Sequence, residues 1–145
     1  MSDVLTLSQI KMPGTARSKD DAIRETGEIL VDVGAVTPAY IDSMFEREKS
    51  VSTYMGNYLA IPHGTNESKE SIKRSALSVI RYPEPIDWDG NEVLFALGIA
   101  GYQGGHMDIL SRIAIVFSDT DEVEKLVAAG SAREIFDLLN AVNQQ

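Results

Sequence analysis

The feature that most limits how this chain can fold is an unbroken apolar run, Val93-Leu94-Phe95-Ala96-Leu97-Gly98-Ile99-Ala100. Successive side chains of a strand point to opposite faces of its sheet, so a strand with this composition needs apolar cover on both faces. Such cover is normally supplied by helices. The run therefore predicts a central strand with helices packed on each side.

Other strands are predicted by alternation and by short apolar runs. Leu77 and Val79 alternate with Ala76, Ser78 and Ile80, which predicts a strand from Ser75 to Tyr82 with two differently lined faces. We expect Pro83 and Pro85 to end this strand, because proline cannot donate to a β-ladder. Three shorter strands are predicted at 8–12, 58–61 and 86–88, the last followed by a tight turn at Asp89-Gly90-Asn91.

Helices are predicted by their start and stop signals. Ser18 followed by Asp21, Asp119 followed by Glu122, and Ser131 followed by Glu134 are capping boxes, and Thr37-Pro38 is a further helix start. The predicted helices cover 18–33, 37–49 and 106–117, with two more opening at 119 and 131. With 145 residues and no repeat or linker, the chain is expected to form a single α/β domain over residues 1–145, a mixed β-sheet flanked by helices on both faces.

Composition excludes several classes of function. The chain has no cysteine, which rules out disulfides, thiolate metal sites and cysteine nucleophiles. Its net charge of -9 disfavours nucleic acid and anionic membrane surfaces as partners, and a charged partner should present a basic face. No stretch approaches the ~20 apolar residues of a membrane span, and no signal peptide is visible, so we expect a cytoplasmic protein.

The residue types that suggest chemistry lie in Asn57-Tyr58-Leu59-Ala60-Ile61-Pro62-His63-Gly64-Thr65. Pro62 should end strand pairing just before His63, which leaves the imidazole on a rigid base with an open face. A nucleophilic histidine needs one nitrogen held by a hydrogen bond and the other available for attack. The same pattern also fits a polar residue that merely ends a strand, and spacing alone does not separate these interpretations.

The motif Ala60-Ile61-Pro62-His63-Gly64-Thr65 resembles the phosphorylation motif of phosphotransferase-system (PTS) IIA domains of the mannitol and fructose type, and is most similar to the mannitol-specific members. The resemblance extends to Arg47-Glu48-Lys49, Tyr54-Met55-Gly56, Tyr82-Pro83-Glu84 and His106, so it covers essentially the whole chain. It implies the EIIA type-2 fold and a phosphoryl carrier that needs no cofactor and no metal. The donor would be the phosphocarrier HPr. The acceptor would be a cysteine of an EIIB domain, which must lie on another polypeptide, as in a membrane EIICB sugar permease.

The resemblance also implies roles for particular residues. His63 would be the phosphorylated nucleophile, with His106 and Arg47 as electrostatic partners and Thr65 and Gly64 beside the phosphoryl group. The residues alone leave alternatives open: Arg47 is equally well solvated helix surface, and His106 a helix-capping residue at the start of its helix. Asn57 departs from the pattern, because some similar members carry an acidic residue there.

Two other functions compete with sugar transport. A regulatory module, like the nitrogen-related IIA proteins, would share the histidine and use its phosphorylation to switch partners. A metal hydrolase using both histidines is a weaker interpretation, because no His-x-x-x-His pair exists and Asp108 is the only carboxylate adjacent to either histidine. The sequence does not identify the sugar, because this kind of domain does not contact it.

Overall fold

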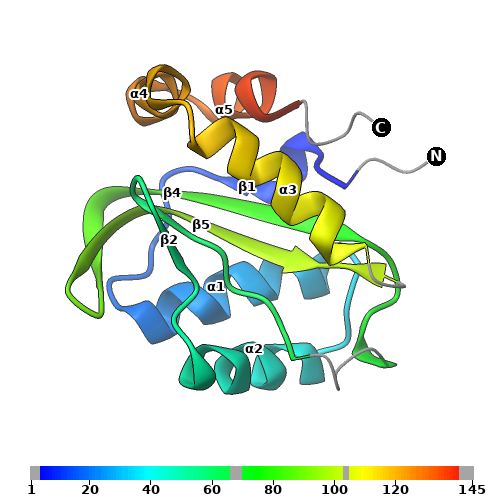
Figure 1. Ribbon diagram of the computed structural model, residues 1–145. Helices are drawn as coiled ribbons and strands as arrows, with labels where there is room; N and C mark the ends of the chain where they lie inside the picture. Colours follow the sequence, from blue (N-terminus) through cyan, green and yellow to red (C-terminus); the bar gives the residue numbers. More distant parts are fainter. Residues whose placement is uncertain (1–3, 66–69, 103–104, 141–145) are drawn as a thin grey trace.

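The middle layer of the molecule is a five-stranded mixed sheet (Figure 1). The structure is a computed structural model, and it describes residues 4–65, 70–102 and 105–140. The strand order is β1-β4-β5-β3-β2. The strands are β1 (Ile10–Lys11), β2 (Tyr54–Gly56), β3 (Leu59–Ala60), β4 (Ala76–Trp88) and β5 (Asn91–Ala100). The run that predicted a central strand forms most of β5, which lies in the middle of the sheet.

The pairing directions make the sheet mixed. β4 and β5 form a long antiparallel hairpin, while β1 pairs with β4 and β3 with β5 in parallel. β2 adds antiparallel to β3 at the edge. Because β3 and β5 are parallel, their carboxyl ends lie side by side. The site described below lies at these strand ends.

Helices cover both faces of the sheet, as predicted (Figure 1). On one face lie α1 (Lys19–Asp32) and α2 (Ala39–Ser50); on the other lie α3 (His106–Phe117), α4 (Thr120–Ala128) and α5 (Ala132–Leu139). The predicted caps are confirmed at Ser18, Asp119 and Ser131, whose side chains accept hydrogen bonds from first-turn amides. None of the described helices is long and apolar enough to cross a membrane.

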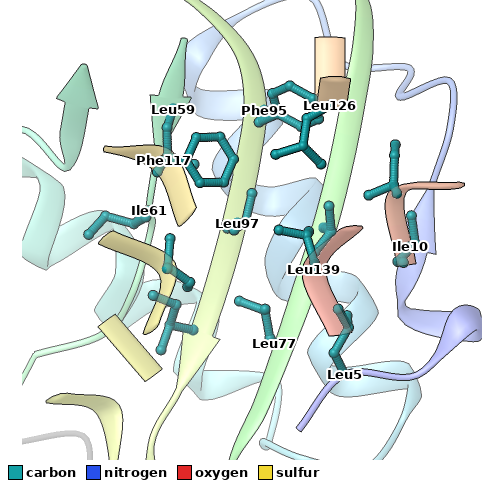
Figure 2. Packing of buried hydrophobic residues seen from close by; sticks show 14 of the residues in the cluster. Leu5, Ile10, Leu59, Ile61, Leu77, Phe95, Leu97, Phe117, Leu126 and Leu139 are labelled. Carbon is teal, nitrogen blue, oxygen red and sulfur yellow. The ribbon is translucent and has the colours of Figure 1, made fainter. Parts of the chain in front are cut away.

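Each face of the sheet has its own hydrophobic core. On β5, Phe95 and Leu97 face α3, α4 and α5, and Figure 2 shows them packed near Leu59 and Phe117. The opposite face of β5 carries small residues, and a Cβ on Gly98 would lie 2.8 Å from Cβ of Thr26 in α1. The small side chains therefore let α1 approach closely, while the large ones on the other face pack in the core beneath α3, α4 and α5.

The prolines do not end β4, so that prediction was wrong. The strand continues to Trp88, with a register shift between Arg81 and Ile86 where Pro83 and Pro85 lie. Because β1 pairs with β4 only at Val79 and Ile80, no neighbouring strand needs a donor from the prolines on that side. A shifted register supplies the unpaired positions that proline requires.

Two smaller differences concern short segments. The predicted strand at 8–12 is reduced to β1, because Leu7–Gln9 form the 3-10 helix η1. The segment 51–56, for which no strand is predicted, contains β2. This strand pairs with β3 through a tight turn in which Asn57 and Tyr58 have positive φ values of 51° and 68°. Such a turn twists with the strands and is a common hairpin connection.

Candidate active site

His63 lies in register with the sheet, one step beyond where sequence reasoning ended the pairing. The parallel register of β3 with β5 continues to a bridge between His63 and Ile99, and the Ile99 amide donates to the Pro62 carbonyl at 3.0 Å. The expectation that pairing stops before His63 was therefore wrong by one residue. Proline is compatible with this pairing, because Pro62 takes part through its carbonyl, which accepts from Ile99, and not through an amide proton. The half-buried His63 is held by the sheet on its backbone side.

The imidazole of His63 has a defined orientation. Its Nδ1 lies 2.7 Å from the carbonyl oxygen of Ile61, two residues earlier in the chain. A carbonyl can only accept a hydrogen bond, so Nδ1 carries the ring proton and the in-plane lone pair belongs to Nε2. This is the arrangement that a histidine nucleophile requires, with one nitrogen fixing the tautomer.

Tyr40 of α2 anchors the chain on the other side of His63. Its buried hydroxyl donates to the Ile99 carbonyl at 2.7 Å and accepts from the Gly64 amide at 2.8 Å. Burial raises the pKa of Tyr40 to about 12, although the Gly64 hydrogen bond lowers it, so the hydroxyl stays protonated at neutral pH. The Gly64 amide is thus directed at Tyr40 in this structure.

The topology brings His63 and the start of α3 to the same edge of the sheet (Figure 1). α3 begins at His106, seven residues after Ile99, the bridge partner of His63. The Ser75 hydroxyl accepts a hydrogen bond from the Tyr102 amide at 2.9 Å and so fixes the start of the connection from β5 to α3. The predicted helix over 106–117 is confirmed; the His106 side chain lies outside the described part of the structure.

Arg47 and Thr65 are the remaining predicted site residues. Arg47 lies near the end of α2, and its Nη1 donates to the Val51 carbonyl at 2.8 Å, closing the loop that leads to β2. That bond is the one side-chain hydrogen bond of Arg47 within the described ranges. Thr65 follows Gly64 and is half-buried at the end of the segment that carries His63.

Comparison with known proteins places this geometry in a family. Residues 3–142 match the family model described as phosphoenolpyruvate-dependent sugar phosphotransferase system, EIIA 2. The chain belongs to this EIIA 2 family. A mannitol-specific phosphotransferase enzyme IIA component from Halalkalibacterium halodurans is 50% identical over 141 residues, which is 97% of each chain.

Solved structures show the same EIIA fold. The complex of enzyme IIAMTL and phosphorylated enzyme IIBMTL from Escherichia coli matches with a TM-score of 0.88 and 30% identity, covering 94% of this chain and 97% of that one. Nitrogen regulatory protein IIA-Ntr from Neisseria meningitidis matches with a TM-score of 0.78 and 29% identity, covering 94% and 96%. The fold alone is therefore common to transport and regulatory members.

Asn57, which the resemblance marked as a departure from the family pattern, lies at the opposite end of β3 from His63. Six residues separate the two, roughly 20 Å along an extended chain. The side-chain amide of Asn57 donates through Nδ2 to the Phe117 carbonyl at 2.7 Å. In this structure Asn57 therefore holds the end of α3 and does not lie beside the histidine.

Two buried polar residues near the site escaped sequence reasoning. Tyr40 occupies a buried position of α2, where an aromatic side chain ordinarily indicates core packing. Glu48, buried at the end of the same helix, accepts from the Thr53 amide at 2.9 Å, and the Thr53 carbonyl in turn accepts from the Ile61 amide at 3.0 Å. Local sequence patterns do not mark either residue, because Tyr40 bonds to Ile99 of β5 and Glu48 also accepts from Trp88 of β4.

The metal-hydrolase interpretation finds no support in the described residues. Within residues 4–65, 70–102 and 105–140 no three His, Cys, Asp or Glu side chains are grouped so that they could hold a metal ion.

Proposed function

We propose that His63 accepts a phosphoryl group on Nε2 from phospho-HPr and passes it to a cysteine of a separate EIIB domain during uptake of mannitol or a related sugar. The EIIB domain would belong to a membrane EIICB permease. The protein would act in the cytoplasm as a single domain over residues 1–145, where HPr and the EIIB domain can reach it in turn.

The contact between His63 Nδ1 and the Ile61 carbonyl carries this proposal. With the proton on Nδ1, the Nε2 lone pair attacks phosphorus while the bond from phosphorus to the donor atom breaks and its electrons leave with the donor. The phosphorylated ring then carries a positive charge, which the Ile61 carbonyl dipole stabilises. No proton has to leave. In the second transfer a cysteine thiolate attacks phosphorus, and the electrons of the N–P bond return to Nε2.

The other predicted residues would stabilise charge without carrying the phosphoryl group. A guanidinium can bind two phosphoryl oxygens in a fork, so Arg47 would exchange its Val51 contact for the phosphoryl group. His106, at the amino end of α3, would donate to the same oxygens, where the helix dipole also favours negative charge. Thr65 would add a hydroxyl donor, and Gly64 would keep the approach open.

The assignment to mannitol or a related sugar is based on the names of the relatives, because the site itself does not contact the sugar. The Halalkalibacterium halodurans relative, named mannitol-specific, shares half of its residues with this chain over nearly its full length. None of the 145 residues is a cysteine, so the acceptor thiolate lies outside this stretch of sequence.

The test is incubation with phosphoenolpyruvate, enzyme I and HPr, followed by mass spectrometry of the intact protein. We expect one added phosphoryl group in a linkage that is labile to acid and stable to base. The chain has two histidines, so His63→Gln and His106→Gln form a matched pair. The first should abolish the modification and the second should leave it, at a slower rate. Persistent phosphorylation of His63→Gln would refute the proposal.

A regulatory role is the second candidate, since the IIA-Ntr structure has the same fold. Adding a mannitol EIIB domain to the phosphorylated protein separates the two functions. Rapid loss of the phosphoryl group to the EIIB cysteine is expected for a transport component. A phosphorylated protein that is stable in the presence of EIIB would favour regulation.

A further inference from the structure

The hydroxyl of Tyr40 occupies an unusual place in the sheet. In a regular parallel ladder, a residue such as Ile99 donates its amide to the residue before its bridge partner and accepts from the residue after it. Ile99 does donate to Pro62, before His63. On the other side the Gly64 amide donates to Tyr40 Oη at 2.8 Å, and Tyr40 Oη donates to the Ile99 carbonyl at 2.7 Å.

The tyrosine hydroxyl is therefore inserted where a direct ladder bond between Gly64 and Ile99 would lie. Gly64 and Ile99 are thus linked through the Tyr40 oxygen immediately after His63. Gly64 and Thr65, which follow, are not assigned to a strand. The side chain that carries this hydroxyl is only 2% exposed and belongs to the core on the α1 and α2 face of the sheet, so its position is fixed by core packing.

We propose that Tyr40 is a positioning residue for phosphoryl transfer, which sets the placement of His63 and of the Gly64–Thr65 segment by spacing them from β5. The inference rests on the proposed function of His63. Tyr40 does not touch the phosphoryl group, and it acts through the backbone on both sides of the nucleophile.

The same helix carries a second site residue. Arg47 follows Tyr40 by seven residues, which is two helical turns, so both lie on nearly the same side of α2. Fixing α2 to the Ile99 carbonyl therefore also fixes the helix from which Arg47 extends. One buried hydroxyl couples the nucleophile, its following loop and the helix of its cationic partner.

Tyr40→Phe tests the inference, because it removes the hydroxyl and keeps the ring in the core. Gly64 and Ile99 would then either close into a direct bond, which pulls the loop toward β5, or separate. Either change shifts the nucleophile, and a displacement of about 1 Å can slow transfer by ~100-fold. We expect the maximal rate of transfer from phospho-HPr to fall ~10–100-fold in rapid-quench experiments. KM for phospho-HPr should be unchanged, since a buried hydroxyl cannot touch the partner.

Tyr82→Phe is the matched control. Tyr82 is also fully buried on the α1 and α2 face of the sheet, and its hydroxyl donates to Glu25 Oε1 at 2.8 Å. It lies five residues along β4 from Leu77, the partner of Ile99, so roughly 16 Å from the site. Both variants lose one buried hydroxyl, but only Tyr40→Phe should slow transfer and move the Gly64 amide and His63 ring nitrogen resonances in ¹⁵N NMR spectra.

Equal maximal rates in the two variants, or a change confined to KM, would overturn the inference. A Tyr40→Phe protein that does not fold would also overturn it, because the hydroxyl would then serve the fold as a whole. Failure of the proposed function is distinguishable, since the parental protein itself would then not be phosphorylated on His63.

Discussion

The side-chain amide of Asn57 donates a 2.7 Å hydrogen bond to the carbonyl of Phe117, 60 residues further along the chain. Phe117 is the last residue of α3, and Asn57 is the first of two turn residues with positive φ between β2 and β3. The turn that begins the path to His63 is thus tied to the helix that begins at His106.

Asn57→Asp should destabilise the protein by about 1–2 kcal/mol, because a carboxylate cannot donate to the Phe117 carbonyl and repels the negative end of α3. Asp tolerates positive φ nearly as well as Asn, so the change isolates the lost donor and the added charge. Urea denaturation measures the loss, and Asn57→Gly, which removes the donor without adding charge, should lose less. Transfer rates should stay parental; a slower Asn57→Asp would place this residue in the site after all.

The phosphoryl group should be attached to Nε2 of His63, because the Ile61 carbonyl holds the proton on Nδ1. With ¹⁵N-labelled histidine, two-dimensional ¹H–¹⁵N spectra of the unmodified protein should show the Nδ1–H tautomer. The phosphorylated protein should show ³¹P coupling to Nε2. Coupling to Nδ1 would mean that the ring turns over before transfer.

Arg47→Ala should slow transfer ~10–1000-fold, the range for losing a preorganised donor to developing charge. Arg47→Lys can still donate to the Val51 carbonyl but cannot form the fork, so it should rescue poorly. Lys49→Ala removes an exposed cation from the same last helical turn and should transfer at the parental rate. A parental transfer rate in Arg47→Lys would mean that Arg47 serves only to hold the loop through the Val51 carbonyl.

Because of Glu25, the free energy of unfolding should decrease at acidic pH. Burial raises its pKa, but hydrogen bonds from Lys11, Thr15 and Tyr82 outweigh burial and lower the pKa from 4.5 to about 2. Because the folded value is the lower one, the stabilisation is complete above pH ~4.5 and is lost as pH falls toward ~2; it amounts to about 3 kcal/mol.

Glu25→Gln should therefore be less stable than the parental protein at pH 7 and should converge with it near pH 2. Denaturant unfolding at several pH values measures this difference. Glu28→Gln, which changes an exposed carboxylate on the same helix, is the control and should follow the parental curve. A Glu25→Gln curve parallel to the parental one would contradict the prediction.

Local patterns in the sequence determined the layers of this protein. The apolar run at 93–100 required cover on two faces, the alternation at 76–80 assigned side chains to those faces correctly, and the caps at Ser18, Asp119 and Ser131 placed helix starts. These signals are readable because each depends on neighbours within a few positions. The motif around His63 could likewise be recognised as that of the EIIA family, because it is a continuous run of residues.

Tertiary structure decided what depends on distant partners. Pro83 and Pro85 stay within β4 because β1 covers only part of that strand. The hydroxyl of Tyr40 acquires a role only because the fold brings α2 within hydrogen-bonding reach of Ile99 in β5, 59 residues further along the chain. Hydrogen bonds between elements far apart in sequence leave no periodic trace, since they depend on the register and packing of the folded chain.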